Sequence, residues 1–465
     1  MNVFIRILPL LILILTTSRG LGSPPNILFL FTDDQRFDSF GAMGNPDVKT
    51  PHMDRLIRQG TLFTNAYIQG SMVTATCLPS RAMIMSGKSL FRAPMQLDSG
   101  TLLPQAFRAE GYTTFATGKW HNGVPSFLRC FGKAEAVFFG GAAGTHLNVP
   151  LNYLENGLMH PYWVPGVDDT VLYADAVIHF LQSEASQSRP FFCYVPFTAP
   201  HSPYQAPDEY VQRYVPERLT LPPNVNLERA GSPPQRPRPF PRQGRSNGDS
   251  RTRLAQYYAM VTHLDHQIGR ILEGLTRSGH ARNTIVVLAT DHGYSLGSHG
   301  ERGKANGYEH GSRALISFSG PGIPEGERRT ALVYLLDLYP TLCDLAGITL
   351  PPDLDGLSLA PAIRGDALKT RDTLFTAFMA DQRTIRDERW KLFHRTRPRT
   401  SQLFDLINDP HELNDLAPLP QYADTLKRLH RALAQARRDA GETPERVQEL
   451  MQRRGRSGAR RHPAQ

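Results

Sequence analysis

The sequence predicts an α/β fold in which helices sandwich a large, mostly parallel sheet, followed by a small C-terminal antiparallel α+β subdomain. Apolar segments such as 26–31 (NILFLF) and 284–289 (TIVVLA) lack polar–apolar alternation, which is typical of parallel strands buried on both faces. Segments with helical spacing alternate with them over most of the chain, as in repeated strand–helix–strand units. A length of 465 residues accommodates one large and one smaller domain.

The individual elements follow from the same patterns. Apolar runs indicate strands at 26–34, 113–118, 189–197 and 283–293. Amphipathic spacing indicates helices at 51–60, 101–112, 174–183 and 254–279. Another helix is expected between Pro79, which suits a first helical turn, and Gly87, a stop signal. Short amphipathic strands then follow at 373–380, 384–395 and 402–409, with a closing helix at 422–440.

The first 23 residues differ in composition from the rest of the chain. An early arginine, an apolar run and then small residues are typical of a secretory signal peptide. A short membrane anchor is the alternative, but the run falls short of the roughly 20 apolar residues that span a bilayer. We therefore expect a periplasmic or secreted protein without a transmembrane segment. Residues 24–365 are the predicted catalytic domain and residues 366–440 the subdomain.

The net charge of +9 is concentrated in two segments. Residues 235–253 form a loop rich in arginine and proline, with six arginines and one aspartate, and residues 451–465 carry five arginines and no acid. The remainder is close to neutral. We expect the loop and a basic tail, residues 441–465, to be disordered and solvated, with binding to acidic glycans as the alternative. Aromatic and basic residues form no recognisable nucleic-acid module.

Acidic residues follow two of the predicted strands at the point where each strand ends. Asp33 and Asp34 follow the first strand, and Asp291 with His292 follows a later one. In open α/β sheets, ligands collect at the carboxyl ends of the strands. Three carboxylates brought together there are costly unless a cation neutralises them. The sequence therefore predicts a divalent metal site, although helix caps or turns would account for either segment alone.

Basic residues and histidines cluster in short stretches that also follow predicted strands. These stretches are GKWHNG, APHSPY and the glycine-rich YSLGSHGERGKANGYEHGSR. The candidates in them for binding an anion or moving a proton are Lys119, His121, His201 and Lys304. Lys119 and His121 lie two positions apart, so on an extended segment they face the same side. Structural histidines and a surface lysine are the alternative.

Cys77 lies at the predicted start of a helix, in TATCLPSRAMIMSGK. Backbone N–H groups at that position favour an anion, so a thiolate nucleophile is one interpretation and a buried thiol the other. Cys193 and Cys343 lie in apolar or helical runs typical of buried cysteines. No spacing suggests that Cys77 and Cys130 pair, so the chain is not a disulfide scaffold.

The stretch CLPSR from Cys77 to Arg81, followed after four residues by SG, resembles the Cys-x-Pro-Ser-Arg signature of type I sulfatases of the alkaline phosphatase-like superfamily. Five further groups of residues are similar to family landmarks in the same order: NILFLFTDDQR with TPHMDRL, GKWHN, PHSPY, TDHGYSLGSHG with YEHGSR, and QLFDLINDPHELNDLA. The resemblance covers about residues 25–440. It implies an alkaline phosphatase/sulfatase-like fold and a sulfuric ester hydrolase.

The resemblance also implies a role for each candidate residue. In the family, a formylglycine-generating or sulfatase-maturating enzyme oxidises the signature cysteine to formylglycine, whose hydrate is the nucleophile. The residues that match the metal ligands are Asp33, Asp34, Asp291, His292 and the modified Cys77. The cations that match those holding the hydrate and the sulfate are Arg81, Lys119 and Lys304. His201, with Lys304, matches the group that protonates the leaving alcohol, and His121 the base that breaks the sulfated hemiacetal.

Two positions depart from the family pattern. His292 stands where many members have asparagine, and imidazole is an unusual ligand for a hard cation. The resemblance still implies calcium, the usual metal of the family, and Mg²⁺ or another divalent ion is the alternative. Asn122 follows His121 where many members carry an apolar residue, which implies a subgroup with its own substrate pocket.

Export and a neutral body favour a sulfated saccharide as the substrate. Arg383 and Arg386 of the subdomain are candidates to reach over the pocket and bind acidic sugar groups, with surface charge as the alternative. Two other functions are open, a phosphoester or phosphonate monoester hydrolase of the same superfamily and a non-catalytic binder of sulfated glycans. The two lysines with a single metal site favour sulfate over phosphate, and the competent residue at every catalytic position argues against a binder.

Overall fold

The computed structural model describes residues 23–225, 250–301 and 303–452. The predicted signal peptide lies almost entirely outside the described residues, as do positions 235–249 of the arginine-rich loop and the last part of the tail. Among the residues that are described, no helix has the length and apolar character needed to cross a membrane.

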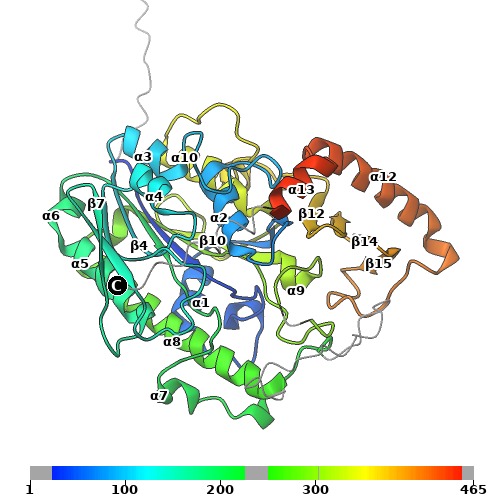
Figure 1. Cartoon of the computed structure of the whole chain (residues 1–465), viewed down its shortest axis with the longest axis horizontal. Helices are drawn as coiled ribbons and strands as arrows, with labels where there is room; N and C mark the ends of the chain where they lie inside the picture. Colours follow the sequence, from blue (N-terminus) through cyan, green and yellow to red (C-terminus); the bar gives the residue numbers. More distant parts are fainter. Residues whose placement is uncertain (1–22, 226–249, 302, 453–465) are drawn as a thin grey trace, which may run out of the picture.

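A ten-stranded sheet forms the centre of the larger domain (Figure 1), in the order β11-β2-β10-β9-β1-β8-β4-β5-β6-β7. The strands are β1 (Asn26–Thr32), β2 (Gly60–Tyr67), β4 (Thr113–Lys119), β5 (Lys133–Phe138), β6 (Leu151–Glu155), β7 (Leu158–Tyr162), β8 (Phe191–Pro196), β9 (Thr284–Thr290), β10 (Arg313–Ser319) and β11 (Glu327–Tyr334). The central strands β9, β1, β8, β4 and β5 pair in parallel, while β10, β6 and β7 pair antiparallel with their neighbours. The predicted α/β class with a mostly parallel sheet is confirmed.

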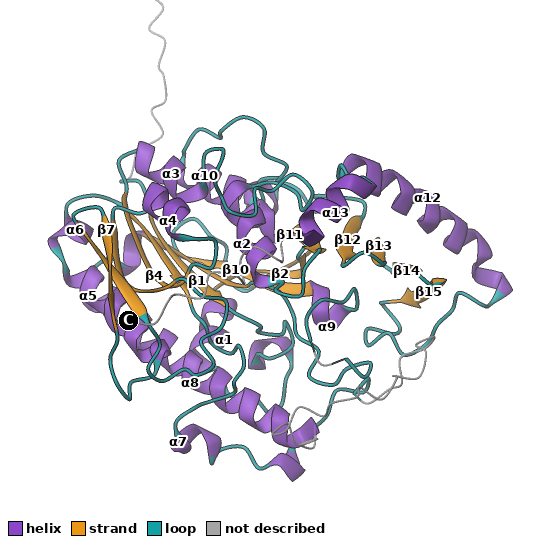
Figure 2. Ribbon diagram, viewed as in Figure 1, coloured by secondary structure: helices purple, strands orange, loops and turns teal. Residues whose placement is uncertain are grey.

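Helices cover both faces of this sheet (Figure 2). One face carries α2 (Cys77–Ser86), α3 (Leu103–Ala109), α4 (Val124–Cys130) and α10 (Leu338–Ala346). The other carries α1 (Pro51–Arg58), α5 (Asp169–Gln182) and α8 (Ser250–Arg277). Short helices are α6 (Glu184–Gln187), α7 (Asp208–Val211), α9 (Glu309–Ser312) and α11 (Ala360–Arg364). The predicted helices are present, and α8 begins four residues before the predicted start, inside the arginine-rich segment.

The apolar sequence of β1 reflects burial on both of its faces. Ile27, Phe29 and Phe31 pack into the core on the α2 side of the sheet. Leu28 and Leu30 pack into the core on the α5 and α8 side. Because successive side chains of a strand point to opposite faces, both sets must be apolar, and the strand shows no alternation. Polar side chains therefore begin only where the strand ends, at its carboxyl end.

A smaller five-stranded sheet forms the subdomain, in the order β15-β14-β13-β12-β3. Its strands are β12 (Leu374–Phe378), β13 (Gln382–Arg386), β14 (Trp390–Thr396), β15 (Arg399–Asp405) and β3 (Gly70–Ser71). The strand predicted at 384–395 is a hairpin instead, because Asp387 Oδ1 accepts from the N–H groups of Arg389 and Trp390 and turns the chain. β3 comes from the larger domain, shortly before Cys77, and so ties the subdomain to that segment.

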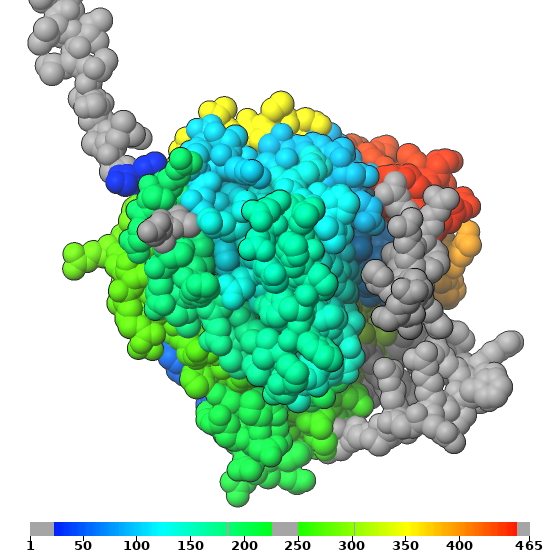
Figure 3. All heavy atoms as spheres, turned by 60° about the vertical axis from the view of Figure 1, so that its left-hand side comes forward, coloured from blue at the N-terminus to red at the C-terminus, as the bar shows by residue number. Residues whose placement is uncertain are grey.

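Two helices close the chain, α12 (Ala423–Asp439) and α13 (Pro444–Gln452). The prediction of a disordered tail from residue 441 is wrong for residues 444–452, which form α13 and bury Leu450 against the larger domain's core. In Figure 3 the cyan and green segments cover the near face, and the red C-terminal helices lie at its right edge.

Candidate active site

The ends of β1 and β9 bring the predicted acidic residues together. Parallel pairing sets Thr32 opposite Thr290, so Asp33 and Asp291 follow at the same edge of the sheet. The Asp34 backbone N–H donates to Asp291 Oδ1 at 3.0 Å, and Asp34 itself adopts a left-handed φ of 63°. All three carboxylates are buried. The structure therefore places the acids in one cluster, as the strand ends predicted.

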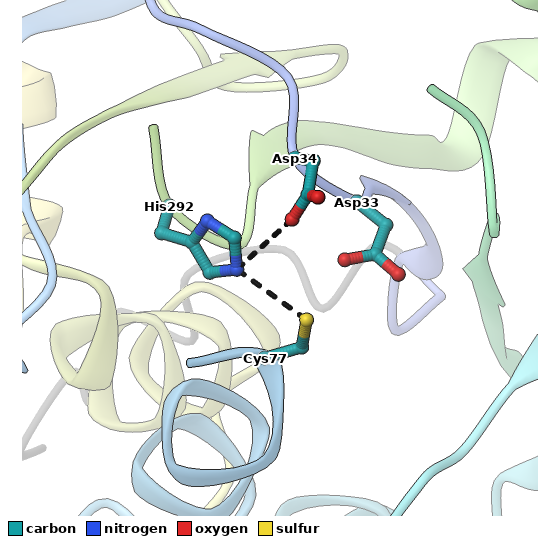
Figure 4. Close-up of side chains that lie close together, drawn as sticks. All are labelled: Asp33, Asp34, Cys77 and His292. Carbon is teal, nitrogen blue, oxygen red and sulfur yellow. Dashed lines mark hydrogen bonds and ion pairs between the residues drawn. The ribbon is translucent and has the colours of Figure 1, made fainter. Parts of the chain in front are cut away.

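Cys77 is the first residue of α2 and lies against this cluster (Figure 4). Its Sγ is 3.5 Å from His292 Nε2 and 2.8 Å from Lys304 Nζ, which donates to it. One turn further along α2, the Ser80 hydroxyl donates to the backbone carbonyl of Asp291 at 2.6 Å. This bond holds the start of α2 against the end of β9, and so holds the cysteine beside the acids.

The tautomer of His292 is set by its own backbone. Its Nδ1 lies 2.8 Å from the carbonyl of Gly293, and a carbonyl only accepts, so Nδ1 carries the hydrogen. In the neutral ring the lone pair is on Nε2, which lies 3.4 Å from Asp34 Oδ1 and 3.3 Å from Asp291 Oδ2. Three electron-rich atoms face one another, which is the arrangement that a cation stabilises.

The donor set as a whole fits a divalent cation. One ligand atom each from Asp33, Asp34, Cys77 and His292 lies within 4.8 Å of all the others. Asp33 Oδ1 and Asp291 Oδ2 are buried and have no hydrogen-bond partner among the described residues. Buried carboxylate oxygens are normally satisfied, so these two point to a ligand that the chain does not provide.

Three basic side chains border the acids. Lys119 Nζ is paired with Asp33 Oδ2, and Lys304 Nζ donates to Asp34 Oδ1 at 2.6 Å. Arg81 donates through Nη1 to the Lys119 carbonyl at 2.7 Å, and its Nη2 lies 3.8 Å from Asp33 Oδ2. The Nε and Nη2 groups of Arg81 are buried without a hydrogen-bond partner among the described residues. The cluster thus holds donors ready for an anion as well as acceptors ready for a cation.

Proton affinities in the cluster reflect this crowding. Burial, and then the negative charges of Asp33 and Cys77, raise the pKa of Asp291 well above its usual value. A bound cation reverses that effect. Burial and Asp33 also oppose ionisation of the Cys77 thiol, but Lys119 and Lys304 outweigh them and lower its pKa to about 6.

His201 lies on the turn after β8, at the edge of the acid cluster. Its Nδ1 donates to the carbonyl of Ser202 at 2.7 Å, which directs Nε2 toward Asp34 Oδ2 at 3.7 Å. The side chain keeps 16% of its surface exposed. An imidazole nitrogen therefore faces both the buried acids and the open side of the site.

His121 follows β4 and is half-buried. Burial, and then the positive charges of Lys119 and Arg81, lower its pKa well below the usual value. A Cβ atom on Gly141 would lie 2.7 Å from His121 Nε2, so glycine at 141 is what makes room for this ring. The charge of Lys119 acts on His121, so the two lie near each other, but His121 has a left-handed φ of 72° and the segment is not the extended one on which the prediction rested.

The family model described as "Sulfatase" matches residues 25–348. The chain belongs to the sulfatase family. It is therefore a hydrolase of sulfate esters. A second model, the C-terminal region of N-sulphoglucosamine sulphohydrolase, matches residues 297–439 of this sulfatase.

Individual relatives cover most of the sulfatase. An ulvan-active sulfatase from Formosa agariphila is 29% identical over 422 residues, which span 86% of this chain and 78% of that protein. Human iduronate 2-sulfatase is 28% identical over 389 residues, or 70% of each chain.

Solved structures show the same fold. One, determined with its substrate D-glucosamine-2-N,6-O-disulfate, has a TM-score of 0.76 at 22% identity and covers 91% of the sulfatase and 99% of that chain. The phosphonate monoester hydrolase of Agrobacterium radiobacter has a TM-score of 0.68 at 22% identity, with 90% and 96% covered.

The two subdomain arginines are not at the active site of the sulfatase. Arg383 is 1% exposed and donates through Nε to Glu442 at 2.9 Å. Arg386 is 4% exposed, donates to the Tyr67 hydroxyl and lies 3.7 Å from Glu309. The prediction that they bind acidic sugar groups is wrong, and so is the surface-charge alternative, because both guanidinium groups are buried and paired.

Asn122 also has a different place from the one expected. Rather than lining a substrate pocket, its buried amide donates to the carbonyls of Met95, at 2.8 Å, and Leu78, at 3.3 Å. It thereby ties the segment after His121 to α2. Sequence reasoning missed Gly118, which has a φ of 79° and where a Cβ atom would overlap the carbonyl of Pro196.

A pocket of about 120 Å³ lies between His121 and the subdomain. Most of its lining is apolar and includes Met72, Leu78, Pro79, Met95 and Leu450. Leu450 comes from α13, which Arg446 anchors by donating to the Phe91 carbonyl at 2.7 Å. The part of the tail predicted to be disordered therefore forms one wall of a pocket beside the active site.

Proposed function

We propose that this sulfatase removes sulfate from a sulfated saccharide, with formylglycine made from Cys77 as the nucleophile and a divalent cation, calcium first of all, on the neighbouring acids. One observation carries the proposal. Cys77 Sγ lies 2.8 Å from Lys304 Nζ and 3.5 Å from His292 Nε2, inside a buried cluster of acids and bases. Cys193, by contrast, is buried in β8 and has its pKa raised by burial alone.

The residues that would hold the cation are Asp33, Asp34, Asp291 and His292, with the modified side chain at position 77. The cation would supply positive charge that balances the carboxylates and stabilises charge on sulfate oxygens. Formylglycine hydrate would supply one hydroxyl that attacks sulfur and a second whose deprotonation releases sulfate, so that water need not attack sulfur.

The basic side chains would bind the sulfate group. A sulfate ester carries its charge on terminal oxygens, and that charge shifts toward the leaving oxygen during cleavage. Arg81 has spare buried N–H groups, and Lys119 and Lys304 bring two further positive charges to the same cluster. Donors that are already in place cost little reorganisation when the charge moves.

The two histidines would move protons in opposite directions. His201 has its Nδ1 hydrogen occupied by the Ser202 carbonyl, so Nε2 is the atom that would donate a proton to the leaving alcohol. His121 has a lowered pKa, which keeps it neutral at physiological pH and able to accept a proton. Its Nδ1 has no hydrogen-bond partner among the described residues.

Three relatives or neighbours support a saccharide as the alcohol. One is an ulvan-active sulfatase, one is iduronate 2-sulfatase, and one structure was solved with a sulfated glucosamine as its substrate. These names concern those proteins, and their agreement on sulfated sugars is what we extend to this sulfatase.

Mass spectrometry of the peptide that contains position 77, taken from the native host, tests the nucleophile. We expect formylglycine there, and turnover in a desulfation screen of sulfated mono- and polysaccharides. Only unmodified thiol in the native protein would exclude the formylglycine mechanism. Recombinant protein made with and without a maturation enzyme is the matched control, because activity should appear only with that partner.

A phosphonate monoester hydrolase is the second candidate function, because one such enzyme shares the fold over 90% of the chain. A phosphonate monoester, like a sulfate ester, carries negative charge on its terminal oxygens, and the proposed cation site would serve either reaction. Matched sulfate, phosphate and phosphonate esters of one alcohol distinguish the two. We expect the sulfate ester to give the highest kcat/KM, and a higher value for the phosphonate would favour the alternative.

Export is part of the proposal and rests on the composition of residues 1–23. Fractionation of the native host should place the protein in the periplasm or the medium. N-terminal sequencing of the mature chain should begin near residue 24. A mature chain that starts at Met1 would exclude the signal peptide.

A further inference from the structure

A buried histidine and aspartate hold the turn that carries His201. His146 is 4% exposed and Asp169, at the start of α5, is 1% exposed. His146 Nε2 lies 2.8 Å from the backbone carbonyl of His201, and its Nδ1 lies 3.1 Å from Asp169 Oδ1. The other carboxylate oxygen accepts from the hydroxyls of Thr198, at 2.5 Å, and Tyr173, at 3.2 Å.

These contacts determine the protonation of His146. A backbone carbonyl only accepts, so Nε2 must carry a hydrogen to bond to His201. Asp169 already accepts from two hydroxyls, which fits an ionised carboxylate, so Nδ1 must carry a hydrogen as well. With both bonds made, the ring is an imidazolium ion paired with Asp169 in the protein interior.

The same turn is bonded to the metal-binding segment. The Asp33 backbone N–H donates to the Ala199 carbonyl at 3.1 Å, and the His201 N–H donates to the Thr198 carbonyl at 2.9 Å. Asp33, His146 and His201 line one small cavity together. The turn is therefore held on one side by the end of β1 and on the other by the His146–Asp169 pair.

The surrounding charges favour a proton on His146. Burial opposes its charge, but the hydrogen bond and the charge of Asp169 outweigh burial and raise its pKa. The charge of Asp168 also raises the pKa of His146. Burial and Asp169 raise the pKa of Asp168 itself to about 6. His263 on α8, next to Asp168, has a pKa lowered to about 4, chiefly by burial, so it is neutral near pH 7.

We propose that His146, held as an imidazolium by Asp169, is a positioning residue for His201 and fixes the backbone that presents His201 Nε2 to the leaving oxygen. This inference rests on the proposed role of His201 as the proton donor. A sugar alkoxide is a poor leaving group and depends on that proton. A nitrophenolate leaves without one, so only the saccharide reaction should depend on the position of His201.

Two substitutions at position 146 separate the two contacts of the ring. The amide of Gln reaches about as far as Nε2 of histidine and can still donate to the His201 carbonyl. The shorter amide of Asn corresponds to Nδ1 and keeps only the contact with Asp169. We would measure kcat and KM of the mature, metal-loaded enzyme on a sulfated monosaccharide and on 4-nitrophenyl sulfate.

For His146→Asn we expect kcat on the saccharide to fall by roughly 10- to 100-fold, with kcat on the nitrophenyl ester and both KM values changed by less than about 3-fold. His146→Gln should retain kcat on the saccharide within about 3-fold. Equal losses for the two variants, or for the two esters, would overturn the inference. The matched control is His179→Gln. His179 is an exposed histidine on α5, the helix that begins with Asp169, and its substitution should change neither rate.

A measurement without turnover keeps the inference separate from the proposed function. Nitrogen-15 NMR of histidine-labelled wild-type protein, assigned with His146→Gln, should show two protonated ring nitrogens for His146 at pH 7. A neutral ring would overturn the inference even in an active sulfatase. Wild-type protein that hydrolyses no sulfate ester would overturn the proposed function, and with it the role of His201.

Discussion

Two buried clusters of charge in this sulfatase have opposite characters. The active-site cluster at the ends of β1 and β9 leaves buried oxygens of Asp33 and Asp291 without hydrogen-bond partners among the described residues. The cluster between the domains has each acid paired with a cation. Lys391 Nζ lies 2.9 Å from Glu309 Oε1 and 2.7 Å from Glu412 Oε1.

The difference lies in what completes each cluster. Around Glu309, burial is outweighed by Lys391 and Arg386, and the pKa of Glu309 falls to about 2. Glu412 shares Lys391 with it, and burial raises the pKa of Glu412 to about 7. Within the active site, burial and then the charges of Asp33 and Cys77 raise the pKa of Asp291, while nearby cations lower those of Asp33 and Asp34. The clusters therefore differ in their pairing: both interdomain acids lie beside Lys391, whereas the active-site cluster leaves Arg81 N–H groups as well as carboxylate oxygens without hydrogen-bond partners among the described residues, as expected of a site that receives a ligand.

Loss of the nucleophile should break the active-site cluster most completely. We expect Cys77→Ala to lower kcat by at least about 10⁴-fold, as removal of other covalent nucleophiles does. Its thermal unfolding temperature should stay close to that of the wild type, because one small side chain is lost from a polar site. Cys193→Ala is the matched control. It should lower stability by about 1–2 kcal/mol and retain activity, because it removes an apolar contact from the sheet core.

Metal removal should affect the active-site cluster and leave the interdomain cluster unchanged. A chelator should lower both kcat and the unfolding temperature, and added calcium should restore them, because a ligand that binds only the folded state stabilises it. Asp291→Asn should lower kcat by at least about 100-fold and weaken the calcium response. Asp337→Asn, which breaks a buried pair with Arg371 elsewhere, should lower stability without changing that response. An unfolding temperature indifferent to chelator in the mature enzyme would contradict the metal site.

The interdomain cluster should respond to pH instead of metal. The pKa of Glu309 is about 2 in the folded protein against an ordinary 4.5, so its stabilisation is present above about pH 4.5 and is lost as the pH falls toward 2. Glu309→Gln leaves Lys391 and Arg386 with less negative charge and should cost about 3 kcal/mol at pH 7.

Urea unfolding between pH 3 and pH 7 checks that expectation. The wild type should lose stability on acidification more steeply than Glu309→Gln. Glu327→Gln, on the exposed part of β11, is the matched control and should change stability by less than about 0.5 kcal/mol. Parallel curves for wild type and Glu309→Gln would show that Glu309 carries no such charge.

The smallest effect is expected from the corrected arginine. Arg383→Met removes a buried partner of Glu442 and should lower the free energy of unfolding by about 2 kcal/mol. KM for a sulfated saccharide should stay within about 2-fold of the wild type, since Arg383 does not reach the substrate. Arg399→Gln, an exposed residue on β15, should change neither quantity. A large rise in KM for Arg383→Met alone would indicate that Arg383 binds the substrate after all.

Local sequence patterns were sufficient to predict the features that depend only on residues close together in the chain. The unbroken apolar runs of β1 and β9 predicted buried parallel strands, and parallel strands in register bring their following acids together. Pro79 and Gly87 predicted the limits of α2, and Gly87 ends it with a left-handed φ of 63°. The place of Cys77 beside these acids did not follow from local patterns and was implied only by the resemblance of CLPSR to the sulfatase signature.

Distant partners could not be predicted in this way. Arg383 looks like any arginine on an amphipathic strand until Glu442, 59 residues later, is seen to bury it. The tail reads as basic and polar, yet α13 places Leu450 against the core. His146 lies in a loop without a recognisable motif, and its partners Asp169 and His201 are 23 and 55 residues away.

By itself, the sequence of this sulfatase determined the α/β fold, the strand ends that carry acids and the cysteine at the start of a helix, because each follows from residues close together in the chain. Only the tertiary structure decided which charges are satisfied inside the protein and which, among the described residues, have no hydrogen-bond partner. The free energy of a buried charge depends on partners brought in from distant segments and on their orientation, and neither is encoded in local spacing.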